Sequence, residues 1–183
     1  MDMRMLTATH VSPGGPWMPD GAGLAAALAR GVKQAGGDIR VVMGRGPAAG
    51  ALAAALEKEV SGVRALCFVC EGLPPRYWPG WAAGLTLCGQ TVWCICDMGS
   101  ALSGPALEAA RWAGGRKLAG LTLIAWGAPP AACDPATLYA ALGWKAIEIA
   151  EGNGAGIVAT LSSRSGSGTP LPVAVFIKTQ GDA

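Results

Sequence analysis

Histidine and charge are scarce in this sequence. His10 is the single histidine, and Lys, Arg, Asp and Glu together make up 14% of the 183 residues. No Ser, His and Asp occur in an order typical of a hydrolase, and no pair of carboxylates is placed for acid–base work. The sequence therefore offers no catalytic set of its own, which agrees with an enzyme whose chemistry is carried by a cofactor.

Long apolar runs and a leader sequence are also missing. No apolar run reaches the roughly 18 residues that a membrane span requires, and the first residues show no charged-then-apolar pattern. The net charge is +2, with Lys and Arg scattered along the chain. We expect a soluble, cytoplasmic protein that binds neither membrane nor nucleic acid. Its 51% of hydrophobic residues predicts a sheet buried on both faces and a homodimer or homotetramer.

Metal-binding spacing is absent among the cysteines. Most of them lie inside apolar strand-like runs, without the local turn that separates metal ligands in a zinc knuckle. We expect buried, reduced thiols and no metal, because free cysteine behaves as a small hydrophobic residue. The six cysteines are Cys67, Cys70, Cys88, Cys94, Cys96 and Cys133.

Residues 4–43 read as one βαβ unit around which the chain is organised. An apolar strand over 4–11 is followed by a glycine-rich turn over 12–23, a helix over 24–35 and a buried strand over 39–42. Asp20 is placed to cap the helix. Such a turn exposes backbone N–H groups at a helix N-terminus, which is where α/β proteins often bind phosphate, but every βαβ unit needs a turn. Both interpretations stay open.

The rest of the chain continues the alternation of strands and helices in one domain. The fold class expected is a three-layer α/β fold with a five-stranded parallel sheet in the order 2-1-3-4-5. Residues 1–150 form this domain, and residues 151–183 extend it as a β-hairpin, because two apolar runs at 157–161 and 171–178 flank a Ser/Gly loop. The further elements expected are helix 47–60, strand 63–70, strand 90–96, helix 105–113, strand 118–126 and helix 134–142, followed by an apolar segment at 144–150.

Two further turns follow strands on the expected binding edge. In the segment 71–81, Tyr77, Trp78 and Trp81 lie among prolines, which predicts a loop whose aromatics line a ligand pocket or a subunit interface; core packing of Trp81 is a third interpretation. The segment 98–104 is rich in glycine and serine and allows close backbone approach. We expect Pro74 and Ser100 to lie on one edge with Ser12.

These turns resemble those of the flavodoxin-like fold and, within it, the NAD(P)H-dependent FMN reductases, over about residues 3–127. The resemblance implies that FMN binds at the three turns and passes electrons from NAD(P)H to a small acceptor. Two alternatives stay open, a non-enzymatic flavodoxin-like module that has lost the cofactor and a nucleotide-sugar-binding domain, since the first forty residues also resemble the start of GT-B glycosyltransferases. The residues implied to bind the cofactor are Ser12, Gly14, Gly15, Gly21, Ala22, Gly23, Leu73, Pro74, Tyr77, Trp78, Trp81, Gly99, Ser100, Ser103 and Gly104.

Overall fold

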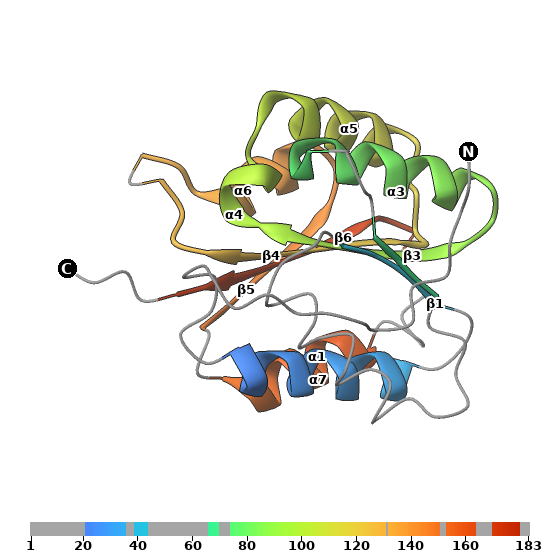
Figure 1. Ribbon diagram of the computed structural model, residues 1–183. Coiled ribbons are helices and arrows are strands. Elements are labelled where there is room, and N and C mark those ends of the chain that lie inside the picture. Colours follow the sequence, from blue (N-terminus) through green and yellow to red (C-terminus); the bar gives the residue numbers. More distant parts are fainter. Residues whose placement is uncertain are drawn as a thin grey trace.

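The computed structural model describes residues 21–35, 39–43, 66–69, 74–130, 132–150, 153–163 and 170–179. Within these residues a parallel sheet lies between two layers of helices (Figure 1). The strands follow the order β2-β1-β3-β4-β6-β5, and every neighbouring pair is parallel. The strands are β1 (Ile39–Met43), β2 (Leu66–Val69), β3 (Thr91–Asp97), β4 (Leu121–Gly127), β5 (Lys145–Ala150) and β6 (Val173–Lys178).

The helices cover both faces of the sheet. In Figure 1, the helices α1 and α7 lie below the sheet, and α3 to α6 lie above it. The helical elements are α1 (Gly21–Ala35), the short 3-10 turn η1 (Pro75–Tyr77), α3 (Trp78–Leu87), α4 (Met98–Ala101), α5 (Gly104–Gly115), α6 (Pro135–Ala141) and α7 (Gly154–Ser162). The expected α/β class with a parallel sheet is confirmed.

Strand β3 shows why the sheet is buried on both faces. Its residues alternate between two core clusters, because successive side chains of a strand point to opposite faces. Cys94 and Cys96 belong to the cluster under α3, α5 and α6, whereas Trp93 and Ile95 belong to the cluster against α1 and α7. All four are at most 1% exposed. A parallel strand covered on both sides needs a continuous apolar sequence, and this strand has one.

Helices α1 and α7 pack closely and run in the same direction. A Cβ built on Gly31 would lie 2.8 Å from Leu161, and one on Gly154 would lie 3.9 Å from Ala27. Ala27 precedes Gly31 in α1, and its partner Gly154 precedes Leu161 in α7, so the two helices are parallel. Because α1 leads into the start of β1, the N-termini of both helices lie at the edge where the strands end.

The upper layer is joined by buried hydrogen bonds. The Tyr139 hydroxyl of α6 donates to the carbonyl oxygen of Ala101 at 2.8 Å, and Trp144 Nε1 donates to the carbonyl oxygen of Ala110 at 2.7 Å. The Tyr139 ring also meets the rings of Trp144 and Phe176 edge to face, with centroids 5.3 and 5.1 Å away. These contacts tie α6 to α4, α5 and the sheet.

The strand order differs from the expected 2-1-3-4-5. Strand β1 at 39–43 lies between β2 and β3, where the expected order had 39–42 at the edge of the sheet. The expected reversal of strand order does occur, but the strand from which the order runs in both directions is β1 at 39–43. The expected strand 4–11, the cap Asp20 and the helix 47–60 lie outside the described residues.

The expected β-hairpin after residue 150 is wrong. Residues 157–161 belong to helix α7, and the run that follows is strand β6, which lies parallel between β4 and β5. Ile157 and Leu161, four residues apart, are both fully buried on one helical face. Asn153 caps the helix by accepting from the N–H of Gly156 at 2.8 Å. The cap and the packing of α7 on α1 outweigh the strand preference of the β-branched residues at 157–161. The apolar segment at 144–150 supplies strand β5.

Candidate functional site

Four of the described strands are followed by turns at the carboxyl edge of the sheet. The turn η1 follows β2, α4 follows β3, residues 128–130 and 132–134 follow β4, and α7 follows β5. The N-terminus of α1 reaches the same edge from the other face (Figure 1). Strand order reverses between β1 and β3, and ligands of open α/β sheets bind outside the strand ends at such a reversal. This edge is the candidate site.

Asp97 organises the turn at the end of β3. Its carboxylate accepts from the Ser100 N–H at 2.7 Å and from the Ser100 hydroxyl at 2.5 Å, one bond to each oxygen. The Ser103 hydroxyl donates to the carbonyl oxygen of Ser100 at 2.7 Å. Asp97 is thus the N-cap of α4, and both of its carboxylate oxygens are engaged.

Glycines keep this turn compact. A Cβ on Gly99 would lie 3.2 Å from Asp97 Oδ1, which is closer than most side-chain contacts. Gly127, at the end of β4, has a φ of +123°, and a Cβ there would lie 3.5 Å from that of the buried Met98. Only glycine adopts such a φ without strain, so the end of β4 can lie close against α4.

The expected aromatic loop at 71–81 is instead helical from Pro75 onward. Pro75 begins η1, and Pro79 is the second residue of α3. Proline is tolerated in the first turn of a helix because the N–H groups there have no helical partner. Trp78 is 8% exposed and belongs to the core cluster that includes Val42 of β1. Its place in the core favours a packing role, and its role in ligand binding stays a prediction.

The other aromatics of this segment lie nearer to the surface. Tyr77 is 41% exposed, with the guanidinium carbon of Arg76 5.1 Å from its ring centroid. Trp81 is half-buried and packs against the same core cluster as Trp78. Tyr77 is therefore the most exposed of the three aromatic residues in this segment.

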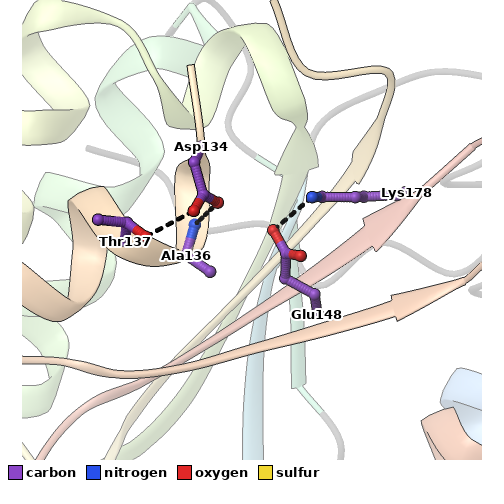
Figure 2. A network of polar contacts seen from close by, with 5 residues as sticks. All are labelled: Asp134, Ala136, Thr137, Glu148 and Lys178. Atoms are coloured by element: carbon purple, nitrogen blue, oxygen red, sulfur yellow. Dashed lines mark hydrogen bonds and ion pairs between the residues drawn. The ribbon is translucent and has the colours of Figure 1, made fainter.

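A second polar group lies where α6 begins (Figure 2). Asp134 caps α6, accepting from the Thr137 hydroxyl at 2.5 Å and from the Ala136 N–H at 3.2 Å. The hydrogen bond from Thr137 is the main cause that lowers the pKa of Asp134 below its ordinary value. Nearby, Lys178 Nζ at the end of β6 lies 2.6 Å from Glu148 Oε1 of β5. The charge of Lys178 is thus already balanced within the chain.

The described candidate residues do share the carboxyl edge. Pro74 and Tyr77 belong to η1 and its flank, Gly99 and Ser100 to α4, and Ser103 and Gly104 to the start of α5. Gly21, Ala22 and Gly23 open α1 at the same edge but on the opposite face. The remaining candidates, Ser12, Gly14, Gly15 and Leu73, lie outside the described residues.

Sequence reasoning missed three residues that shape this edge. The cap Asp97 could have been found, because Asp directly before a helical segment is a preferred N-cap residue. Glu148 and Lys178 could not, because 30 residues separate them and only the insertion of β6 beside β5 brings them together.

The thiols agree with the expectation in part. Cys94 and Cys96 are buried and reduced, whereas Cys88 is exposed at the end of α3 and Cys133 is half-buried. Cys67 lies in β2, and Cys70 is outside the described residues. No group of three or more His, Cys, Asp or Glu side chains within the described part could hold a metal ion. None of the described helices is both long and apolar enough to span a membrane.

The chain is similar to solved structures of two enzyme classes. Transketolase from Leishmania mexicana matches with a TM-score of 0.61 and 15% identity, over 86% of this chain and 36% of that chain. A transketolase variant from Pichia stipitis with fructose 6-phosphate matches with 0.60 and 14%, over 86% and 35%. The 2-oxoglutarate:ferredoxin oxidoreductase from Magnetococcus marinus, with 2-oxoglutarate, coenzyme A and succinyl-CoA bound, matches with 0.55 and 11%, over 85% and 28%. No protein-family model and no curated protein matches the sequence.

These similarities correct the expected family. The resemblance to NAD(P)H-dependent FMN reductases is wrong, and with it FMN as the cofactor, because the matching structures are a transketolase and a ferredoxin oxidoreductase. Three glycine- or aromatic-rich turns at a carboxyl edge are common to many parallel α/β folds, so they did not discriminate between families. The chain spans about a third of the length of these enzymes, and the identities show the fold alone.

Proposed function

We propose that this chain is one domain of a transketolase-like enzyme, and that its carboxyl edge forms part of a ligand site completed by a second domain. The observation that carries the proposal is the reversal of strand order between β1 and β3, where the α4 turn opens on the edge. Because the chain spans about a third of the similar enzymes, another domain would supply catalytic residues, whereas the edge of this chain would bind and position the ligand by itself.

The ligand class proposed is a small carbonyl compound with an anionic group. Fructose 6-phosphate and 2-oxoglutarate, named with two of the similar structures, share these features. The edge suits an anion, since the N-terminal ends of α1 and α7 both reach it with glycine-rich first turns. Lys178 lies at the same edge, but Glu148 balances its charge, so this pair adds no net attraction for an anion.

Transfer of a ketol group and oxidation of a 2-oxoacid both break a carbon–carbon bond next to a carbonyl. Thiamine diphosphate supplies the carbanion stabilisation that such reactions need. Enzymes commonly bind a diphosphate through Mg²⁺ held by one or two carboxylates. At this edge the carboxylate of Asp97 is engaged by Ser100, and the described residues include no metal-binding cluster. The described residues thus include no set of three or more metal ligands, and the role proposed for them is to bind and position the organic ligand.

The engagement of Asp97 as a helix cap also favours a second candidate function. A module that has lost the cofactor and serves a structural or assembly role would also keep Asp97 as a cap. The two candidates differ in whether the isolated chain binds a small carbonyl compound.

The melting temperature tests the proposal. We expect fructose 6-phosphate or 2-oxoglutarate, at ten times its dissociation constant, to stabilise the chain by about 1.4 kcal/mol, which raises the melting temperature by about 3 to 6 °C. FMN should leave it unchanged. Thiamine diphosphate, added with and without Mg²⁺, tests whether the edge binds a metal-bound diphosphate. Equal shifts of the melting temperature in both conditions would agree with the absence of a metal-binding cluster among the described residues. If neither carbonyl compound shifts the melting temperature, the binding role fails and the second candidate stands.

A matched pair of variants locates the site. Gly104 and Gly115 lie at opposite ends of α5, and a Cβ at either would meet no atom within 4 Å. Gly104→Leu fills space at the carboxyl edge and should abolish the ligand-induced shift. Gly115→Leu places the same side chain at the other edge and should preserve it. A shift that survives in Gly104→Leu would place the ligand elsewhere.

A further inference from the structure

Two exposed arginines stack on aromatic rings, one at each edge of the sheet. The guanidinium carbon of Arg76 lies 5.1 Å from the ring centroid of Tyr77, and that of Arg116 lies 5.3 Å from the ring centroid of Trp112. Arg76 belongs to η1, which follows β2 at the carboxyl edge, whereas Arg116 ends α5 at the opposite edge. The two arginines therefore make the same kind of contact at different places in the fold.

The position of Arg76 is unfavourable for a cation. Arg76 directly precedes Tyr77, the N-cap of α3, and the N-terminal end of a helix carries a partial positive charge. Arg116 is the C-cap of α5, at a helix end whose partial negative charge favours a cation. The stability of the helices thus accounts for Arg116 but not for Arg76.

No described carboxylate balances the charge of Arg76, which forms no ion pair with the described residues. Asp97, in the neighbouring turn, is engaged as the cap of α4. Lys178, a second cation at this edge, is paired with Glu148. Arg76 is thus a cation at the candidate site whose charge no described side chain balances.

Stacking leaves the hydrogen-bonding edge of this guanidinium available. A guanidinium over an aromatic ring is attracted through its face, while its five N–H donors point outward in its plane. Two such donors match two oxygens of a carboxylate or a phosphate. The turn η1, which carries Arg76, packs against α4 and α5, so this arginine belongs to the wall of the candidate site beside the turn at Ser100.

We propose that Arg76 binds the anionic group of the small carbonyl ligand, a phosphate or a carboxylate, and thereby selects charged over neutral ligands. The inference rests on the proposed function for the class of ligand and on the surroundings of Arg76 for the residue that binds it. An anion bound there meets the guanidinium and the N-terminal end of α3 together, and both favour negative charge. The unfavourable charge of Arg76 in the free chain is therefore balanced when the ligand is bound.

Isothermal titration calorimetry of the full chain measures this selection. Fructose 6-phosphate with fructose, and 2-oxoglutarate with 2-oxobutyrate, are two pairs of ligands that differ by one anionic group. The wild type should bind the more charged member of each pair about 10-fold more tightly or better, and Arg76→Gln should weaken that member about 10- to 100-fold without affecting the other. Arg76→Lys keeps the charge but not the planar fork, so it should lose only part of the preference.

Arg116→Gln is the matched control, because it removes a stacked arginine from the opposite edge and should leave both preferences unchanged. Thermal melting separates a binding role of Arg76 from a structural one. Arg76→Gln should melt within about 2 °C of the wild type, because the lost stacking is offset by removal of an unfavourable charge. Arg116→Gln should melt lower, since it loses both stacking and a favourable charge.

Inorganic phosphate separates failure of this inference from failure of the proposed function. If the carbonyl compounds do not bind, but phosphate binds the wild type and not Arg76→Gln, Arg76 stands as the anion-binding residue and the proposed function fails. If Arg76→Gln keeps the preference for charged ligands, or Arg116→Gln loses it equally, the role of Arg76 is overturned and the proposed function stands. A wild type that binds none of these anions overturns both.

Discussion

The layer of α1 and α7 and the layer of α4, α5 and α6 hold their helices in different ways. Between α1 and α7, Gly31 lies against the side chain of Leu161, and the polar link from Ser162 to Gln34 is exposed. In the other layer, buried hydrogen bonds from Tyr139 and Trp144 reach backbone carbonyls of other helices. Contact between apolar side chains can adjust by small shifts, whereas a buried hydrogen bond has a narrow geometry. We therefore expect the upper layer to tolerate change less.

The largest effect is expected for Gly114→Ala in α5. A Cβ there would lie 1.9 Å from the carbonyl oxygen of Leu142, which is backbone and cannot rotate away. We expect a loss of about 3 kcal/mol in the free energy of unfolding, measured from urea denaturation midpoints. Gly115→Ala is the control, since a Cβ there meets no atom within 4 Å. Equal effects of the two substitutions would show that α5 and the turn after α6 are not in close contact.

Tyr139→Phe should be next. It removes the hydroxyl that donates to the Ala101 carbonyl and should cost about 1 to 3 kcal/mol at neutral pH. Burial raises the pKa of Tyr139 well above its ordinary value. The unfolded chain ionises this tyrosine near pH 10 and the folded chain does not, so the wild type loses stability as the pH rises above about 10.

The difference between the wild type and Tyr139→Phe should therefore shrink between pH 8 and pH 10.5. Urea midpoints at the two pH values measure it. A difference that stays constant would mean that the hydroxyl can ionise in the folded chain and is not buried as described.

A smaller effect is expected for Gly31→Ala, the same substitution in the lower layer. The new Cβ would lie 2.8 Å from Leu161, but Ala gains about 1 kcal/mol of helix propensity over Gly. We expect a net loss of about 1 kcal/mol. Combined with Leu161→Ala, the substitution should cost somewhat less than it does alone, because the contact with Leu161 Cδ1 at 2.8 Å is removed while the contact with its Cβ remains. A loss as large as that of Gly114→Ala would remove the contrast between the layers.

The smallest effect is expected at the exposed cap of α6. Thr137→Ala removes the hydrogen bond that chiefly lowers the pKa of Asp134, so that pKa should rise toward its ordinary value in an NMR titration. The stability that this carboxylate contributes is present above about pH 4 and is lost as the pH falls through the lowered pKa. The variant should show a weaker acid dependence of its melting temperature. An unchanged pKa would mean that another donor replaces Thr137.

Local signals in the sequence predicted several elements well. Helix 24–35 lies within α1, helix 105–113 within α5, and Asp134 with Pro135 begins α6 as expected. In each case the residues that determine the element are neighbours in the chain. Turn residues were less informative, because Pro75 and Pro79 are as compatible with the start of a helix as with a loop.

The candidate site was predictable only as an edge. Glycine and serine at 99–104 mark a turn after a buried strand, and parallel strands place such turns together. The protein family could not be predicted from these turns, because unrelated α/β proteins have turns with the same residue types. The engagement of Asp97 by Ser100, which makes this carboxylate the cap of α4, is a matter of atomic distances.

The sequence by itself determined the α/β class, because alternation of buried strands with amphipathic helices depends on residues a few positions apart. Only the tertiary structure decided that 157–161 is a helix and that β6 enters the sheet between β4 and β5. It also decided that Glu148 meets Lys178. The physical reason is that these outcomes depend on contacts between segments distant in sequence, whose free energies compete with local preferences of similar size.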